Sequence, residues 1–177
     1  LSVESIDTQG SARTTDGNGY SGGSVSLAGN DISVALINSG GGRSEGDDFT
    51  GGIGGAIDII AANDVNVVAG AGNGIYSLGG NGPNSGGNKN SFVNDGTGGK
   101  GGAVTLEAGR DLIIHAGVSA DGGVGATGSG DDGIGGEGGV IGLTATRNLE
   151  VNAEISSKGG VATTSDNNDR DGTGGKG

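Results

Sequence analysis

The feature that most constrains this chain is a block of residues that recurs with a fixed alternation of apolar and polar side chains. Residues 101–122 and 138–159 align without a gap, and each block opens on a pair of glycines. Within a block, apolar residues occupy every second position, which predicts β-strands with one buried face. One block cannot bury its own apolar row, so successive blocks are expected to stack on one another.

The recurring block predicts one continuous repeat array over residues 1–177. Repeats begin at about residues 22, 54, 101 and 138, with a partial repeat at 1–21 and the start of a further one at 174–177. In the second repeat, Ala69 and Ala71 continue the alternation and are expected to form its final, weaker strand. The predicted fold is an all-β parallel β-helix, or solenoid, of about four stacked coils plus partial copies at both ends, with glycine-rich inserts on one face.

Glycine makes up 46 of the 177 residues, and pentads of the form Gly-Gly-x-Gly-Gly recur at one position of the repeat. The central residue is Ile53, Lys100 or Glu137, so this position is expected to face outward. Glycine permits close backbone approach, which predicts that the pentads form tightly stacked corners. A phosphate-binding loop is the alternative, but the Lys-Ser/Thr pair of that motif does not follow the pentads. The inserts can also be extended polyproline-II strands alongside the β coils.

The composition argues against several classes of partner. The formal net charge of −12 at pH 7 does not suit nucleic acid or anionic membranes, because both require an excess of Lys and Arg. No apolar run approaches the roughly 18 residues that a membrane helix needs, so no membrane insertion is expected. The chain has no Cys, which excludes disulfides and thiolate metal sites.

Aspartates recur just before the pentads and gather again near the end of the chain. In-register stacking would bring such carboxylates close enough to repel by about 1 kcal/mol, and bound Ca²⁺ would relieve that repulsion. The alternative is that Asp-Gly is a common turn pair and that no cofactor is required. The calcium candidates are Asp48, Asp95, Asp132, Asp166, Asp169 and Asp171.

Aromatic residues are scarce and lie in or near the inserts, where they either contact glycans or anchor the loops. The candidates for glycan contact are Tyr20, Phe49, Tyr76 and Phe92. His115 is the single histidine, and its place in the alternation predicts an exposed strand residue. A lone histidine cannot form a zinc site or a Ser-His-Asp relay, and no enzymatic activity is expected.

Two phrases, residues 101–112 and 22–32, resemble the repeats of large bacterial filamentous-haemagglutinin-like proteins. Proteins of this family are exported by two-partner secretion and related routes. The resemblance covers nearly the whole chain through degenerate repeats. It implies a secreted, right-handed β-helix that is displayed on the cell surface or shed from it and is used in adhesion or matrix building.

The expected function is therefore that of a non-catalytic structural or adhesive segment of an extracellular bacterial surface or filament-forming protein. A carbohydrate-binding or polysaccharide-cleaving β-helix is the alternative. The expected partners are other copies of the chain or neighbouring repeats end to end, and host or matrix glycans or proteins.

Overall fold

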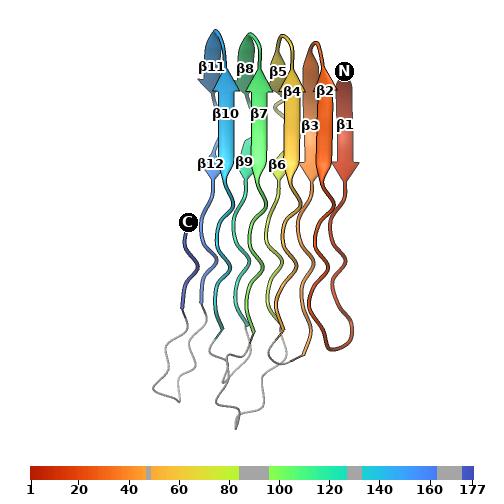
Figure 1. Ribbon diagram of the computed structural model, residues 1–177, viewed down its shortest axis with the longest axis vertical. Helices are drawn as coiled ribbons and strands as arrows, with labels where there is room; N and C mark the ends of the chain where they lie inside the picture. The colour runs from red at the N-terminus through yellow and green to blue at the C-terminus, as the bar shows by residue number, and fades with distance from the viewer. Residues whose placement is uncertain (47–48, 84–95, 127–132, 163–172) are drawn as a thin grey trace.

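The computed structural model describes residues 1–46, 49–83, 96–126, 133–162 and 173–177. These residues form an all-β structure without helices, in which neighbouring strands run parallel in two sheets (Figure 1). The larger, 8-stranded sheet contains β1 (Ser2–Asp7), β3 (Ile32–Asn38), β5 (Val65–Val67), β6 (Gly74–Tyr76), β8 (Asp111–Ile114), β9 (Gly117–Ser119), β11 (Asn148–Val151) and β12 (Ile155–Ser156). The smaller, 4-stranded sheet contains β2 (Val25–Gly29), β4 (Ile57–Ala61), β7 (Val104–Ala108) and β10 (Ile141–Ala145).

The strand register agrees with the predicted alignment of the repeats. Ile141 lies opposite Val104, and Leu149 lies opposite Leu112, so the gapless match of residues 101–122 with 138–159 is confirmed. The partial repeat at the N-terminus also pairs as expected, with Ile6 opposite Ile37. Equivalent residues of successive repeats therefore lie side by side along the stack.

The core lies between the two sheets and consists of the alternating apolar rows. Ile59, Leu106, Leu112 and Ile114 are each 0% exposed. Full burial of such a side chain stabilises the fold by about 1.5–3 kcal/mol. Because each row continues from one repeat to the next, the core is a narrow aliphatic column that needs no aromatic residue.

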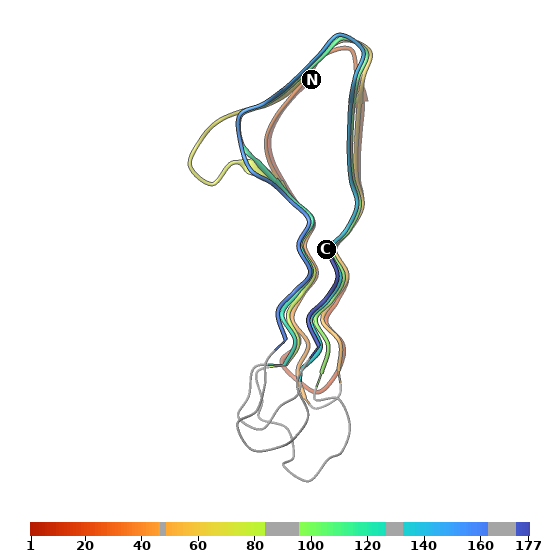
Figure 2. The same cartoon turned by 90° about the vertical axis from the view of Figure 1, so that its left-hand side faces the viewer.

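The final strand of the second repeat differs from the prediction. Ala69 and Ala71 are exposed, and β6 instead places Ile75 in the core, opposite Ile37 and Val118. Residues 68–73 leave the stack as a protruding loop (Figure 2). The larger apolar surface of Ile75 favours this arrangement, and lengthening a surface loop costs little free energy.

Below the sheets, the chain forms two closely spaced layers of extended segments, which we call the glycine bundle (Figure 2). The outgoing layer carries the chain away from the larger sheet and contains residues 8–13, 39–46, 77–83, 120–126 and 157–162. The returning layer carries it back to the smaller sheet and contains residues 17–24, 49–56, 96–103, 133–140 and 173–177.

The glycine bundle repeats every third residue. Along residues 51–56 and 98–103, two buried residues are followed by one exposed residue. Gly51 N donates sideways to Thr97 O at 2.8 Å, whereas Gly52 N donates across to Gly42 O of the other layer at 2.8 Å. A period of three is that of polyproline II. The pentads are thus straight segments and not the predicted corners, while the outward position of the central residue is confirmed by exposed Ile53.

Glycine is required where the two layers and successive segments meet. A Cβ added to Gly99 would lie 2.0 Å from Gly52 O, and one added to Gly123 would lie 2.0 Å from Gly80 O. Both separations are far shorter than any real contact of a Cβ atom, and the atoms they involve belong to the backbone. Close packing of this kind excludes every other residue, as at the axis of collagen.

Candidate functional site

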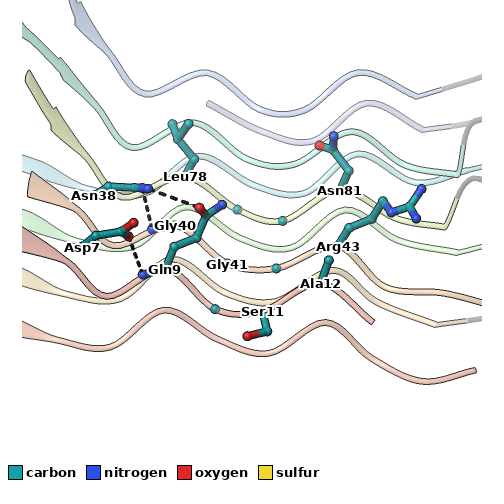
Figure 3. Close-up of a pocket in the computed structure, with 14 residues that line it drawn as sticks. Asp7, Gln9, Ser11, Ala12, Asn38, Gly40, Gly41, Arg43, Leu78 and Asn81 are labelled. Carbon is teal, nitrogen blue, oxygen red and sulfur yellow. Dashed lines mark hydrogen bonds between the residues drawn. The ribbon is translucent and has the colours of Figure 1, made fainter. Parts of the chain in front are cut away.

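A shallow groove of about 680 Å³ lies on the outer face of the outgoing layer, across its first three segments (Figure 3). Outward-facing residues at equivalent positions of these segments form short rows across the groove. The rows are Asp7 with Asn38, then Gln9 with Gly40 and Leu78, then Ala12 with Arg43 and Asn81.

The groove exists because Gly40 has no side chain. Its neighbours in the same row, Gln9 and Leu78, stand on either side, and the next segments continue the row with Asp121 and Lys158. A Cβ on Gly40 would meet Asn38 Oδ1 and Leu78 O at 3.5 Å, which is ordinary van der Waals contact. Unlike the glycines between the layers, Gly40 therefore leaves room for a Cβ atom.

Three amide side chains, those of Gln9, Asn38 and Asn81, line the groove. Asn38 Nδ2 donates to Gln9 Oε1 at 3.2 Å, and Asn38 Oδ1 accepts from Gly40 N at 3.3 Å. Asp7 Oδ1 accepts from Gln9 N at 3.0 Å. At the other end, Asn81 Oδ1 accepts from Val124 N at 3.1 Å. Amides both donate and accept hydrogen bonds, so this lining suits a neutral polar ligand such as a sugar.

One charged pair borders the groove. Arg43 Nη2 lies 2.8 Å from Glu45 Oε2, and both side chains are about one-third exposed or less, at 33% and 26%. Because Glu45 balances the guanidinium, this end of the groove does not present an unpaired positive charge. Of the lining residues in the part of the chain that the structure describes, Asp7 is the one carboxylate.

Two further ion pairs lie away from the groove, at the turns between the two sheets. Arg110 Nε donates to Asp64 Oδ1 at 2.8 Å, and Arg147 Nε donates to Asp111 Oδ1 at 2.8 Å. Hydrogen bonding to the guanidinium of Arg110 lowers the pKa of the Asp64 carboxyl, and Arg147 lowers the pKa of Asp111 in the same way. Each arginine reaches back to the preceding repeat, so these pairs hold the stack together and do not form a reactive centre.

The six calcium candidates, Asp48, Asp95, Asp132, Asp166, Asp169 and Asp171, all lie outside the described residues. Within the part of the chain that the structure describes, no group of three or more His, Asp or Glu residues could hold a metal ion. Calcium binding by the aspartates stays a prediction.

Three of the four aromatic candidates are described, and none of them lines the groove. Tyr20 lies in the returning layer with its ring centroid 4.3 Å from Arg13 Cζ. Tyr76 lies in β6, where its hydroxyl donates to Asn73 O at 2.9 Å. Phe49 is half-buried at the start of a returning segment, and Phe92 lies outside the described residues. These positions place the described aromatics in separate parts of the fold.

Sequence reasoning did not find the groove because a missing side chain defines it. The available signal was the outward row of Gln9, Gly40 and Leu78, which becomes visible only when the inserts are aligned with a period of three. His115, by contrast, is exposed just after β8 as the alternation predicted, with its Nδ1 3.2 Å from Asn152 Nδ2.

Comparison with known proteins gives little further guidance. No family model and no curated protein matches the chain. A solved structure of the nine polyproline type II helical bundle antifreeze protein from the springtail Granisotoma rainieri aligns with 96% of this chain and 93% of its own, at 21% identity and a TM-score of 0.25. The described residues include no helix that is long and apolar enough to cross a membrane.

Proposed function

We propose that this chain is a non-catalytic, structural and adhesive segment of a secreted or cell-surface bacterial protein, built as a parallel β-helix with a glycine bundle along one edge. The observation that carries the proposal is that the core residues follow one repeating pattern whereas the surface residues vary. Ile, Val and Leu side chains fill a repeating core, while outward rows of the bundle vary in chemistry from one segment to the next, as in the row of Ile53, Lys100 and Glu137. A scaffold that keeps its core and varies its surface is suited to displaying contacts along a rod.

The resemblance to filamentous-haemagglutinin-like repeats supports the same reading. Neighbouring repeats or other copies end to end are the proposed scaffold partners, and host or matrix glycans or proteins are the proposed ligands. An acidic surface, with a net charge of −12, favours solubility outside the cell and disfavours nucleic acid.

Carbohydrate binding is the second candidate, and the groove is the observation that favours it. Gln9, Asn38 and Asn81 offer amide groups over a glycine floor, which matches the hydroxyls of a neutral glycan. Cleavage of a polysaccharide is less well supported, because glycosidases generally use two carboxylates and Asp7 is the one carboxylate among the described residues that line the groove. The second candidate function is therefore carbohydrate binding without hydrolysis.

Filling the groove tests both candidates. Gly40→Gln adds a side chain where a Cβ makes only ordinary contacts, and we expect it to weaken binding to glycan arrays and immobilised matrix proteins by about tenfold or more. Gly142→Gln is the matched control, because a Cβ there meets only Thr105 Cγ2 at 3.9 Å in β10, on the smaller sheet.

The outcomes separate the two functions. Loss of binding in Gly40→Gln but not in Gly142→Gln supports an adhesive groove. Equal binding by wild type and Gly40→Gln removes the groove from the proposal. If the wild-type chain binds no glycan or matrix protein at all, the adhesive role is wrong and only the structural role remains.

A further inference from the structure

We propose that the groove at Gly40 selects glycans that carry acetamido groups, such as those built from N-acetylglucosamine, over plain hexose polymers. The inference rests on carbohydrate binding, the second candidate function, and names the class of ligand. It follows from the direction in which the amide side chains of the groove present their donors, and from the apolar side chain that stands beside them.

A backbone N–H fixes the orientation of the first two amides. Gly40 N donates to Asn38 Oδ1 at 3.3 Å, so the oxygen of this amide is engaged within the protein. Asn38 Nδ2 in turn donates to Gln9 Oε1 at 3.2 Å, which engages the oxygen of the second amide (Figure 3). Exchanging oxygen and nitrogen in either amide would bring two donors or two acceptors face to face, so hydrogen bonding selects this arrangement.

Asn81 is oriented in the same way at the other end of the groove. Val124 N donates to Asn81 Oδ1 at 3.1 Å. Among the described residues, Asn81 Nδ2 and Gln9 Nε2 donate to no other residue. All three amides thus use their oxygens within the protein and keep N–H groups for a ligand, so the amides offer more free donors than free acceptors.

Leu78 supplies an apolar surface beside these donors. It continues the outward row of Gln9 and Gly40, and it is 37% exposed. Neighbouring segments lie roughly 4.8 Å apart, so the backbones at Leu78 and Gln9 are separated by about 10 Å across the glycine. The space above Gly40 can therefore admit a sugar ring between an apolar wall and a polar one.

An acetamido group matches this combination. Its carbonyl oxygen accepts the hydrogen bonds that the free N–H groups of the groove offer, and its methyl group can pack on Leu78. A plain hexose has a hydroxyl at the same position. The hydroxyl can accept a hydrogen bond, but it gives Leu78 no apolar contact and lacks the favourable burial of a methyl group.

The charges of the groove disfavour acidic glycans. Asp7 lines the same end of the groove as Gln9 and Asn38. The guanidinium of Arg43 is balanced by Glu45, whose Oε2 lies 2.8 Å from Nη2. A uronate would therefore meet a like charge, and no unpaired cation among the described lining residues would offset it.

The test titrates the full chain with three trisaccharides by isothermal titration calorimetry. The N-acetylglucosamine trimer and the glucose trimer have the same linkage and differ in the acetamido group alone, and a glucuronate trimer of that linkage adds carboxylates. We expect the N-acetylglucosamine trimer to bind about tenfold more tightly than the glucose trimer. The glucuronate trimer should bind more weakly than either.

Two variants test the two contacts separately. Leu78→Ser removes the apolar surface and should reduce the preference for the N-acetylglucosamine trimer to about twofold or less. Asn81→Asp keeps an acceptor for Val124 N but replaces the free N–H donors by an oxygen, and it should weaken binding of the N-acetylglucosamine trimer by about fivefold or more. Asn30→Asp is the matched control, because it makes the same change at an exposed turn after β2 and should bind as the wild type does.

The outcomes distinguish this inference from the function on which it rests. Equal binding of the N-acetylglucosamine and glucose trimers would overturn the acetamido preference and leave carbohydrate binding in place. Binding of neither trimer would remove carbohydrate binding and the inference with it. A Leu78→Ser variant that keeps the full preference would also overturn the inference, because Leu78 would then not be the contact that selects the methyl group.

Discussion

At the scale of single residues, hydroxyl groups join the sheets to the glycine bundle. Thr8, Ser39, Ser77 and Ser157 occupy the equivalent position in four outgoing segments, and each donates to a glycine carbonyl of the returning layer. Ser77 Oγ, for example, donates to Gly55 O at 2.5 Å and is fully buried. The remaining segment has Ala120 at this position, which leaves one gap in an otherwise regular row.

Filling this gap should stabilise the protein. We expect Ala120→Ser to raise the free energy of unfolding by about 0.5–1.5 kcal/mol, because a new hydroxyl would donate a hydrogen bond to Gly102 O. Ser77→Ala should lower the free energy of unfolding by about 1–3 kcal/mol, because it leaves the carbonyl of Gly55 without this hydrogen bond. Urea denaturation measures both changes. A destabilising Ala120→Ser would show that the 0% exposed site has no room for the oxygen.

At the scale of the elements, the turns between the sheets carry a ladder of charges. Arg110 bridges Asp64 of the preceding repeat and lies 4.0 Å from Asp31 of the repeat before it, and Arg147 bridges Asp111. The pairing with arginine depends on the stacking of repeats that are far apart in the chain.

The ladder predicts a particular response to acid. Because the pKa values of Asp64 and Asp111 lie below the ordinary 3.8 in the folded state, the pairs stabilise the fold fully above that pH. Their contribution is lost as the pH falls through the lowered values. We expect the melting temperature of an R110Q/R147Q variant to fall less steeply than that of the wild type on acidification below about pH 4.

High salt provides a check on this interpretation. These pairs are solvent-exposed, so salt should screen them and reduce the difference between the two proteins at neutral pH. Parallel acid profiles of wild type and variant would show that other carboxylates determine the acid response.

At the scale of the whole molecule, each repeat is stabilised by its neighbours. Leu106 on β7 is 0% exposed because β4 and β10 pack on both sides of its strand. Leu143 lies opposite Leu106 on β10, the edge strand of the smaller sheet, and is only partly buried. The same side chain in the same register thus has two environments.

These environments predict unequal losses of stability. Leu106→Ala should lower the free energy of unfolding by about 2–5 kcal/mol, as for a fully enclosed leucine, and Leu143→Ala by less than half of that. Denaturant titration of the two variants measures the difference. Equal losses would mean that the edge repeat is as well packed as the central ones.

The sequence by itself determined the strands and their register. The alternation of apolar residues is visible within each short segment. The gapless match between repeats places Val104 opposite Ile141 regardless of the length and conformation of the inserts. It did not determine the final strand of the second repeat, because Ala69 and Ala71 alternate as convincingly as the true strand. Only the space in the core, which Ile75 fills and alanine would not, decides between the two segments.

The tertiary structure alone decided what the glycines do. Glycine permits both corners and straight segments, so the sequence of the pentads is compatible with both conformations. The hydrogen bonds across the two layers show that the pentads are straight segments. The groove at Gly40 depends on which segments lie side by side, and that depends on inserts of unequal length. Local patterns define strands, but an exposed glycine and a buried one are distinguished only by their neighbours in space.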